Sequence, residues 1–438
     1  MNARADLPAL DAIRALEPEM LVIRHQIHAH PELAFEEFQT SDLVAERLGH
    51  WGYEVHRGLG GTGVVGTLKR RDGPKRLGLR ADMDALPIQA ASSGRPWASQ
   101  VLGKMHACGH DGHTAMLLGA ARHLAATRDF NGTLHLVFQP AEEGLGGARV
   151  MIEDGFFDRF PCDAMFALHN MPGHPEDTLG FLAGPAMASS DTVIVAVHGK
   201  GGHGAMPQAA CDPVVAASAI VMALQTIVSR NVPPLEMAIV TVGAFHAGSA
   251  PNVIPQSAEL KLTVRALKRE VRLQLKQRIT EICQAQAAVF GARVEIDYQW
   301  RYPVLVNDAE STAFARQVAA DWVGEAGLMP PLQPLTGSED FAFLLKSAKA
   351  AICCWVTAWA RAKAAAWCTT PAMTSTTAAW APGPVTGCGW RRRFCFERGR
   401  LGRRPPARCV NFFTVRLDIQ PHVIMYPFEA GRCTARGR

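Results

Sequence analysis

Five side chains that can bind a metal lie in one short segment, Lys104–Thr114, whose sequence is KMHACGHDGHT. They are His106, Cys108, His110, Asp111 and His113. Imidazole and thiolate groups are preferred ligands of zinc-class divalent metals, and a loop that leads into an apolar helix can bring them together. The alternative is a capping loop whose histidines are only surface polar groups. The density of donors favours a metal site.

A pair of adjacent carboxylates, Glu142 and Glu143, follows a strand-like apolar run in the segment FQPAEEG. At the end of a strand, one carboxylate can bind a metal while the other accepts a proton from a water on that metal. Taken alone, such a pair is more often a solvated loop. Its significance therefore depends on the groups that accompany it.

Three more candidate side chains stand where two apolar runs end. Asp82 and Asp84 follow the run Leu77–Ala81, and His169 closes the run Met165–Leu168. A single histidine at a strand end is more often structural than a ligand. In open α/β sheets, however, sites form beyond the carboxyl ends of the strands, so we expect all these groups to converge.

The segments before about residue 185 alternate between helical and strand-like patterns. Helices are predicted at Leu10–His28, Glu36–Trp51 and His113–Thr127, and strands at Gly63–Leu68, Leu77–Ala81 and Leu134–Phe138. This alternation predicts an α/β fold whose mostly parallel sheet is flanked by helices.

The pattern changes near residue 186. Strands are predicted at Thr192–Val197, Ala238–Val242, Ala258–Val264 and Val294–Tyr298, and helices at Pro213–Ser229 and Arg269–Phe290. Such a set can form a compact α+β unit with its own core. We therefore expect a catalytic domain at residues 1–185 and 301–345, interrupted by a smaller α+β lid domain at residues 186–300.

These motifs resemble those of the M20 metallopeptidase family, in the branch of aminoacylases, hippurate hydrolases and plant auxin-conjugate amidohydrolases. The resemblance runs in order over about the first 345 residues. Its motifs are HAHPELAFEE (His28–Glu37), RADMDALPI, MHACGHDGHTAMLLGAA, VFQPAEEG, HGKGGHGAMP (His198–Pro207), APNVIP (Ala250–Pro255) and TGSEDF (Thr336–Phe341).

The resemblance implies a dinuclear centre of two divalent metal ions, which could be Zn, Mn, Co or Ni. Its ligands would be Cys108, His110, Glu143 and His169. Glu142 would be the general base that accepts a proton from the attacking water and returns it to the leaving amine. Asp84 would orient a neighbouring group.

The resemblance also implies three substrate-binding residues in the lid. His203 would stabilise the oxyanion, often from a partner subunit, and Arg265 would pair with the substrate α-carboxylate. Asn252 matches a further substrate-binding position. Two alternatives remain open: Asn252 as a turn residue between prolines, and Arg265 as a surface ion pair.

Charge is distributed unevenly along the chain. From Lys346 to Arg438 there are 16 Lys and Arg against 3 Asp and Glu, a net charge of +13, whereas the preceding 345 residues carry a net charge of −8. The acidic body gives no reason to expect a nucleic-acid partner. No uninterrupted apolar run is long enough for a membrane span, and the first residues lack the apolar core of a signal peptide, so a cytoplasmic location is expected.

The basic tail also lacks the ending that the resemblance leads us to expect. Family members end in a segment similar to His-Asn-Pro-x-Tyr-Asp-Phe-Asn-Asp, whose histidine is a further metal ligand. Codons for the residues from Trp367 onward, read one base out of frame, permit Val-His-Asn-Pro-Gly-Tyr-Asp-Phe-Asn-Asp, and Phe396–Glu397 permits a stop. We infer a frameshift close to Lys346, real or a sequencing error, and expect residues 346–438 to be poorly ordered. The alternative is an authentic basic tail that binds nucleic acid or an acidic partner.

The expected function is metal-dependent hydrolysis of the amide bond of small, hippurate-like N-acyl amino acids. One alternative is a related peptidase or deacetylase that acts on another amide. Another is a product without activity, because the last metal-ligand segment is lost. The resemblance further implies a homodimer or homotetramer assembled through the lid.

Overall fold

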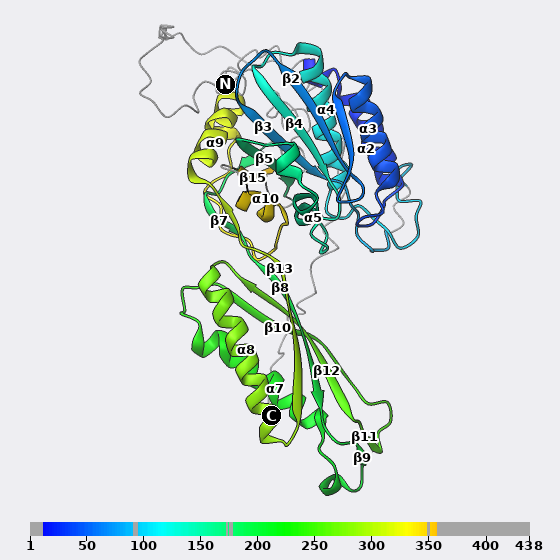
Figure 1. Cartoon of the computed structure of the whole chain (residues 1–438), viewed down its shortest axis with the longest axis vertical. Coiled ribbons are helices and arrows are strands. Elements are labelled where there is room, and N and C mark those ends of the chain that lie inside the picture. Colours follow the sequence, from blue (N-terminus) through cyan, green and yellow to red (C-terminus); the bar gives the residue numbers. More distant parts are fainter. Residues whose placement is uncertain (1–11, 91–94, 172–173, 175–177, 348–350, 357–438) are drawn as a thin grey trace, which may run out of the picture.

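The computed structural model describes residues 12–90, 95–171, 174, 178–347 and 351–356. It has a layered body, the catalytic domain, and an elongated lid that projects from it (Figure 1). The sequence-predicted α/β architecture with an α+β insert is the architecture found. The predicted segment Leu10–His28 begins among residues that are not described.

A seven-stranded mixed sheet with the order β1-β2-β4-β3-β5-β15-β6 forms the centre of the catalytic domain. Its strands are β1 (Glu54–Leu59), β2 (Gly63–Arg70), β3 (Arg76–Asp82), β4 (Gly132–Gln139), β5 (Ala164–Asn170), β6 (Leu179–Gly180) and β15 (Ala351–Val356). The central strands β4, β3, β5 and β15 run parallel, and the outer pairings are antiparallel. The carboxyl ends of the parallel strands therefore meet at one edge.

Helices cover both faces of this sheet, because its strands are apolar on both faces. Adjacent residues such as Val64 and Val65 belong to different cores. One core is closed by α2 (Glu17–Ala29), α3 (Phe38–His50), α4 (His110–Thr127) and α9 (Ala309–Val323). The other is closed by α5 (Gly147–Glu153), α6 (Phe156–Arg159) and α10 (Phe341–Ser347). The short strands β7 (Gly184–Met187) and β14 (Leu305–Asn307) pair beside α10.

Strand β15 corrects one expectation. Residues 346–438 were expected to be poorly ordered, yet Ala351–Val356 pairs in parallel with β5 and antiparallel with β6. Strand pairing uses backbone groups that any residue supplies, and AICCWV is rich in residues with high strand propensity. The expectation that residues 357–438 are poorly ordered concerns residues outside the described part of the chain.

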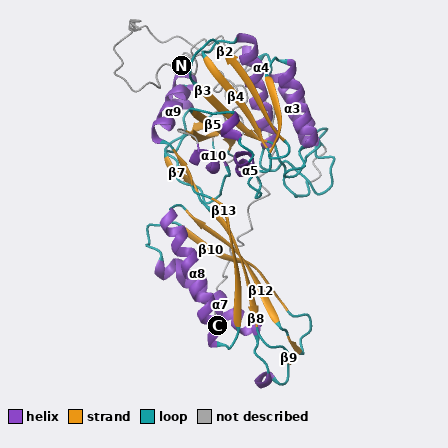
Figure 2. Ribbon diagram, viewed as in Figure 1, coloured by secondary structure: helices purple, strands orange, loops and turns teal. Residues whose placement is uncertain are grey.

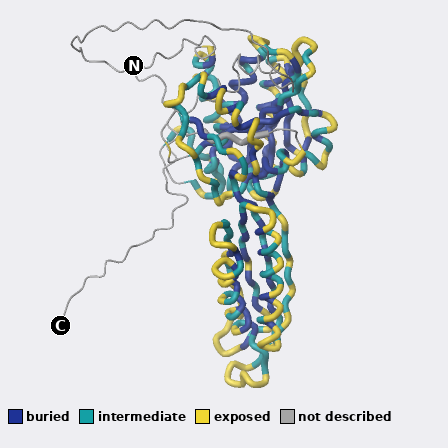
Figure 3. Tube along the Cα trace, turned by 90° about the vertical axis from the view of Figure 1, so that its left-hand side faces the viewer, coloured by how far each residue is buried: buried dark blue, intermediate teal, exposed yellow. Residues whose placement is uncertain are grey.

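The lid is a four-stranded antiparallel sheet with two helices on one face (Figure 2). Its strands follow the order β10 (Ala238–Ala247), β12 (Ser257–Ala266), β8 (Ser190–His198) and β13 (Arg293–Tyr302), and its helices are α7 (Pro213–Thr226) and α8 (Arg269–Val289). Burial alternates residue by residue along β8, so one face packs on the helices and the other faces away from them. Figure 3 shows the buried residues in the layered body and along the middle of the lid.

One lid helix region, Pro213–Asn231, is long and apolar enough to cross a membrane by length and composition alone. Its inner residues, among them Ala217, Ile220 and Leu224, are completely buried in the lid core. Helix α7 is therefore a core helix of the lid with part of its surface exposed. The exposed part includes Met222, which is 72% exposed.

Candidate metal centre and active site

The predicted metal ligands and the other candidate side chains at the strand ends converge at the carboxyl edge of the parallel strands. Asp82 ends β3, the Glu142–Glu143 pair follows β4, and His169 lies near the end of β5. Helix α4 starts at His110 beside them. Segments separated by up to 87 residues of sequence therefore meet at one edge, as the strand-end argument predicts.

A glycine lets the loop before α4 place two donors on one side. Gly109 has a left-handed φ of +97°, and a Cβ atom there would lie 2.4 Å from the side-chain oxygen of Asn170. The flanking Cys108 and His110 form a cluster with His169, in which the ligand atoms lie within 4.8 Å of one another. The Sγ atom of Cys108 is 3.4 Å from Nε2 of His169.

Asp84 orients two of the candidate ligands at once. Its Oδ1 atom lies 3.2 Å from Nδ1 of His110, and its Oδ2 accepts a hydrogen bond of 2.8 Å from the backbone N–H of Glu143. The contact at Nδ1 leaves Nε2 of His110 to face Oε1 of Glu143 at 3.9 Å. A carboxylate behind a histidine ligand is the usual arrangement in metal sites.

The donor set fits a divalent metal. Nε2 of His110 and Oε1 of Glu143 are buried and have no hydrogen-bond partner among the described residues. Burial by itself would lower the pKa of His110, but the carboxylates of Asp82 and Asp84 and the thiol of Cys108 raise this pKa well above its usual value. The groups that attract a proton to this place would equally attract a cation. The mixture of nitrogen, sulfur and carboxylate donors suits a zinc-class ion.

His169 is poised as a neutral ligand. Burial, followed by the nearby His113, lowers the pKa of His169 to about 4, so its ring is uncharged at neutral pH. Its Nδ1 lies 2.6 Å from the backbone carbonyl oxygen of Asn170, which fixes the ring orientation. Neutral imidazole is the form that binds a metal.

Glu142 lies beside the metal donors in an acidic, buried environment. Its Oε1 accepts a hydrogen bond of 3.3 Å from the backbone N–H of Asp340. Burial raises the pKa of Glu142 well above its usual value, and the neighbouring carboxylates of Glu339 and Asp340 raise it further. A carboxyl group that readily takes up a proton has the property required of a general base that later acts as an acid.

The backbone before Glu142 is held in an unusual conformation. Ala141 has a φ of +54°, in the left-handed region that non-glycine residues rarely adopt. Its N–H donates a hydrogen bond of 2.8 Å to the buried carboxylate of Glu37, and its carbonyl accepts one of 2.9 Å from Gly147. Tyr302 continues this support, because its hydroxyl donates to the Glu142 carbonyl and accepts from Gly146. Surrounding contacts therefore fix the turn that aims Glu142.

The structure adds a buried cation that the sequence did not single out. Arg80 is 4% exposed and donates to Asp82 at 2.7 Å, Glu339 at 2.9 Å, Asp340 at 3.0 Å and Gln139 at 2.8 Å. It connects β3 with the segment TGSEDF, 259 residues later. Arg80 opens the motif RADMDALPI, so both segments were recognised, but their contact was not predicted, because no sequence spacing links the two.

The remaining donors of the loop Lys104–Thr114 have other surroundings. His113 is held between Asp82 and Asn170, with 2.6 Å to a side-chain oxygen on either side. Asp111 pairs with Arg24 at 3.0 Å and lies 3.1 Å from His28. His106 is buried, and neither of its ring nitrogens has a hydrogen-bond partner in the described chain.

Of the three lid residues that the resemblance implies, Arg265 is the one that reaches the predicted site. A cavity of about 390 Å³ lies between the lid and the catalytic domain, and both glutamates line it together with Arg265. The Nη1 atom of Arg265 donates a hydrogen bond of 2.8 Å to the hydroxyl of Ser338. Arg265 makes no ion pair with any described residue, so the surface ion pair considered from the sequence is not what the structure shows.

His203 and Asn252 lie elsewhere. His203 belongs to β9 (Gly202–His203), which pairs with β11 (Val253–Ile254) at the tip of the lid, far from the catalytic domain (Figure 1). Both residues are exposed, and Gly204 donates a hydrogen bond of 2.8 Å to the carbonyl of Asn252. The structure brings these two residues together but does not bring them to the metal donors of the same chain.

Comparison with known proteins agrees with this geometry. Residues 78–368 match peptidase family M20/M25/M40. The chain is 48% identical over 336 residues to a hippurate hydrolase of Campylobacter jejuni, covering 77% of this chain and 87% of that protein. It is 41% identical to an N-acetyl-L-cysteine deacetylase of Bacillus subtilis, covering 76% of this chain and 79% of the relative.

Solved structures show the same arrangement. A dinuclear metal-binding peptidase of the M20 family from Bacillus subtilis superimposes with a TM-score of 0.71 at 30% identity, covering 83% of this chain and 99% of that one. The match therefore includes both the layered body and the lid. Together with the clustered donors, these similarities show that the chain belongs to peptidase family M20/M25/M40 and is a metal-dependent amidohydrolase.

Proposed function

We propose that this protein hydrolyses the amide bond of small, hippurate-like N-acyl amino acids at a centre of two divalent metal ions. The observation that carries the proposal is the cavity that Glu142, Glu143 and Arg265 line together. Its volume of about 390 Å³ is in the range of small-molecule sites. It offers carboxylates for chemistry on one side and a guanidinium for a carboxylate on the other.

Each residue has a distinct task in this proposal. Cys108, His110, Glu143 and His169 would hold the metals, which could be Zn, Mn, Co or Ni. Bound divalent ions supply an activated water and polarise the amide carbonyl. Glu142 accepts the proton and delivers it to the leaving amine, while Asp84 keeps His110 and the backbone of Glu143 in place.

Arg265 would bind the α-carboxylate of the substrate through the guanidinium atoms that Ser338 leaves open. His203 and Asn252 would then come from the lid tip of a second copy of the chain. The exposed apolar surface of α7, including Met222, and the outer edge of β10, which pairs with no described strand, are compatible with assembly of lids into a homodimer or homotetramer.

A frameshift near Lys346 remains part of the proposal. The printed chain would then lack one metal ligand of the family ending, so one cation would be under-coordinated. Strand β15 completes the sheet by backbone pairing, but it lies before the position of the lost histidine.

The test compares the chain as printed with a chain whose reading frame is repaired after residue 346. The repaired protein should hydrolyse hippurate and related N-acyl amino acids with Zn, Mn, Co or Ni, and chelators should inhibit it. The printed chain should bind less than two metal equivalents and turn over slowly. Failure of the repaired protein on every N-acyl amino acid would refute the proposed substrate class, whereas cleavage of peptides alone would favour a related peptidase.

A further inference from the structure

A second arginine lines the same cavity, and nothing in the reaction proposed above uses it. Arg301 belongs to β13, the lid strand next to β8, and its side chain faces the space that Glu142 and Arg265 also line. Ser190 and Thr192 of β8 line the cavity beside it. The cavity therefore carries two guanidinium groups on its lid side.

A local irregularity of the strand places Arg301 there. The register between β13 and β8 shifts between Trp300 and Tyr302, which pair with Asp191 and Ser190, so Arg301 is the extra residue of a β-bulge. Bulges redirect a side chain and are common next to active sites. Gln299, two residues earlier, supports the redirected side chain by accepting a hydrogen bond of 2.6 Å from Nη2 of Arg301.

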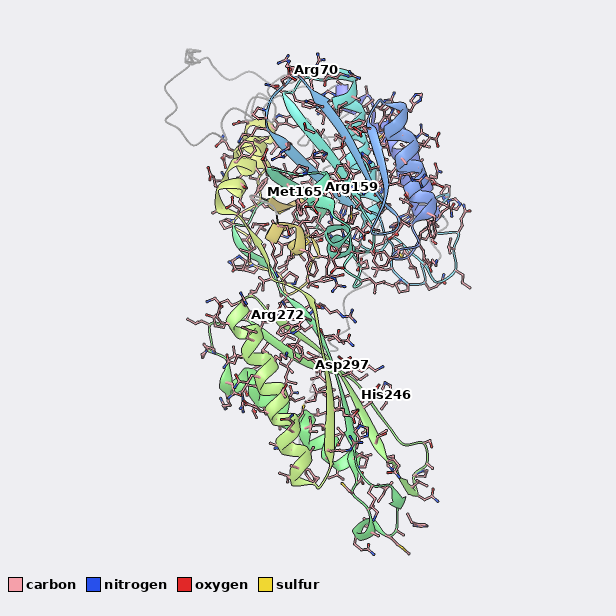
Figure 4. The ribbon with its side chains drawn as sticks, viewed as in Figure 1. Arg70, Arg159, Met165, His246, Arg272 and Asp297 are labelled. Atoms are coloured by element: carbon pink, nitrogen blue, oxygen red, sulfur yellow. The ribbon has the colours of Figure 1, made fainter. Side chains whose placement is uncertain are left out.

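No carboxylate of the described residues forms an ion pair with the guanidinium of Arg301. Asp191 lies near Arg301 on the neighbouring strand β8, but its carboxylate is buried and already bound by Arg272. The Nε atom of Arg272 donates a hydrogen bond of 2.9 Å to Oδ2 of Asp191. Asp191 also accepts a hydrogen bond of 3.3 Å from the Tyr298 hydroxyl and one of 3.2 Å from the backbone N–H of Arg301. Arg272 stands at the end of the lid nearest the catalytic domain (Figure 4). Among the described residues, the side chain of Arg301 makes no ion pair.

The two cavity arginines stand on different strands. On one side of β8, Asp191 pairs with Val264 of β12, the residue before Arg265. On the other side of β8, Asp191 pairs with Trp300 of β13, the residue before Arg301. Two strand spacings separate their backbones by about 10 Å. This separation presents two anchoring points for anionic groups, in addition to the metal donors across the cavity.

We propose that Arg301 determines specificity by binding a second carboxylate where the substrate has one, so that dianionic N-acyl amino acids bind more tightly than monoanionic ones such as hippurate. This inference rests on the proposed function. The second carboxylate could belong to the amino-acid side chain or to the acyl group, and both sources present the same charge to Arg301.

The test uses ligand pairs that differ only in this charge. N-acetylglutamate is compared with N-acetylglutamine, and N-succinylglycine with its terminal amide, by calorimetric titration of the frame-repaired protein loaded with Zn at low ionic strength. In at least one pair the acid should bind about tenfold more tightly than the amide, because hydrogen bonds to a charged group discriminate to this extent. The pair that discriminates identifies which end of the substrate carries the second carboxylate.

Variants distinguish the contribution of Arg301 to acid binding from the contribution of the other positive charges of the lid. Arg301→Gln should reduce the acid-to-amide ratio to near one, and Arg301→Lys should keep part of it. Arg293→Gln, at the far exposed end of the same strand, should keep the full ratio. An unchanged ratio in Arg301→Gln, equal weakening of all four ligands, or no preference in the unmodified protein would overturn the inference. If hippurate and all four ligands fail to bind, the proposed function itself fails, and this inference with it.

Discussion

Asp84→Asn should weaken metal binding without unfolding the protein. Asp84 is 1% exposed, and its two oxygens serve two groups, Nδ1 of His110 and the backbone N–H of Glu143. When Nε2 of His110 binds a metal, Nδ1 carries the proton and needs an acceptor. Asparagine has only one side-chain oxygen, so one of the two buried donors would face an NH₂ group.

The size of the effect follows from this mismatch. A buried donor without a partner costs about 1–3 kcal/mol, which corresponds to a loss of about 5–150-fold in affinity. This agrees with the roughly 10–100-fold typical of groups that orient metal ligands. In the metal-free protein no metal requires the proton on Nδ1, and removal of the Asp84 carboxylate, one of the groups that raise the pKa of His110, favours a neutral ring that can accept from the new NH₂ group. The penalty therefore falls mainly on the metal-bound state.

The assay is competition for Zn against a chromogenic chelator, with thermal unfolding of the metal-free protein measured in parallel. Asp72→Asn, at an exposed turn, is the matched control and should leave Zn affinity unchanged. A Zn affinity of Asp84→Asn within twofold of the unmodified protein would refute the orienting role. If the metal-free Asp84→Asn protein is strongly destabilised, the main role of Asp84 is instead to stabilise the folded structure.

Three further results are expected. Glu142→Gln in the frame-repaired protein should retain metal and lose about 10²–10⁴-fold in turnover; loss of metal by elemental analysis would mean that Glu142 and Glu143 exchange roles. Arg80→Met should lower the free energy of unfolding by about 3–5 kcal/mol in urea titrations, since it leaves buried carboxylates unpaired, and a loss no larger than that of the exposed Arg70→Met would contradict this. Burial raises the pKa of Glu37 from 4.5 to about 7. In the unfolded chain this carboxyl group ionises at a lower pH, so the free energy of unfolding of the unmodified protein should fall by up to about 3 kcal/mol as the pH rises from 4.5 to about 7. Glu37→Gln should not show this fall when urea titrations at pH 5 and pH 8 are compared. If the unmodified protein and Glu37→Gln lose the same free energy of unfolding between these pH values, Glu37 is not the source of the loss.

The convergence of the candidate side chains at the strand ends could be predicted from the sequence because it depends on local rules. Each of Asp82, Glu143 and His169 follows an apolar run, and parallel strands bring such positions to one edge. The helix after Gly109 begins at His110, within three residues of its predicted start. Periodicity and turn chemistry are sufficient for these features.

The features that escaped prediction depend on long-range geometry. Arg80 meets Glu339 across 259 residues, and no spacing in the sequence indicates that contact. Arg301 reaches the cavity because a bulge interrupts β13, and alternation alone does not locate a bulge. His203 is in a recognised motif, but only the structure shows how far the lid tip lies from the metal donors of its own chain.

The position of β15 has a consequence for synthesis on the ribosome. This strand is the last described element of the chain, yet it sits between β5 and β6 inside the sheet. During translation the edge of β5 stays unpaired while the lid and α9 are synthesised. Arg80 cannot contact Glu339 until a further 259 residues have been added. At about 5–20 residues per second, the wait for Glu339 lasts roughly 13–50 s. The lid can fold in that interval, because its strands and helices follow one another in the sequence. The incomplete catalytic domain meanwhile exposes a strand edge, which can pair with other chains and aggregate or can bind a chaperone.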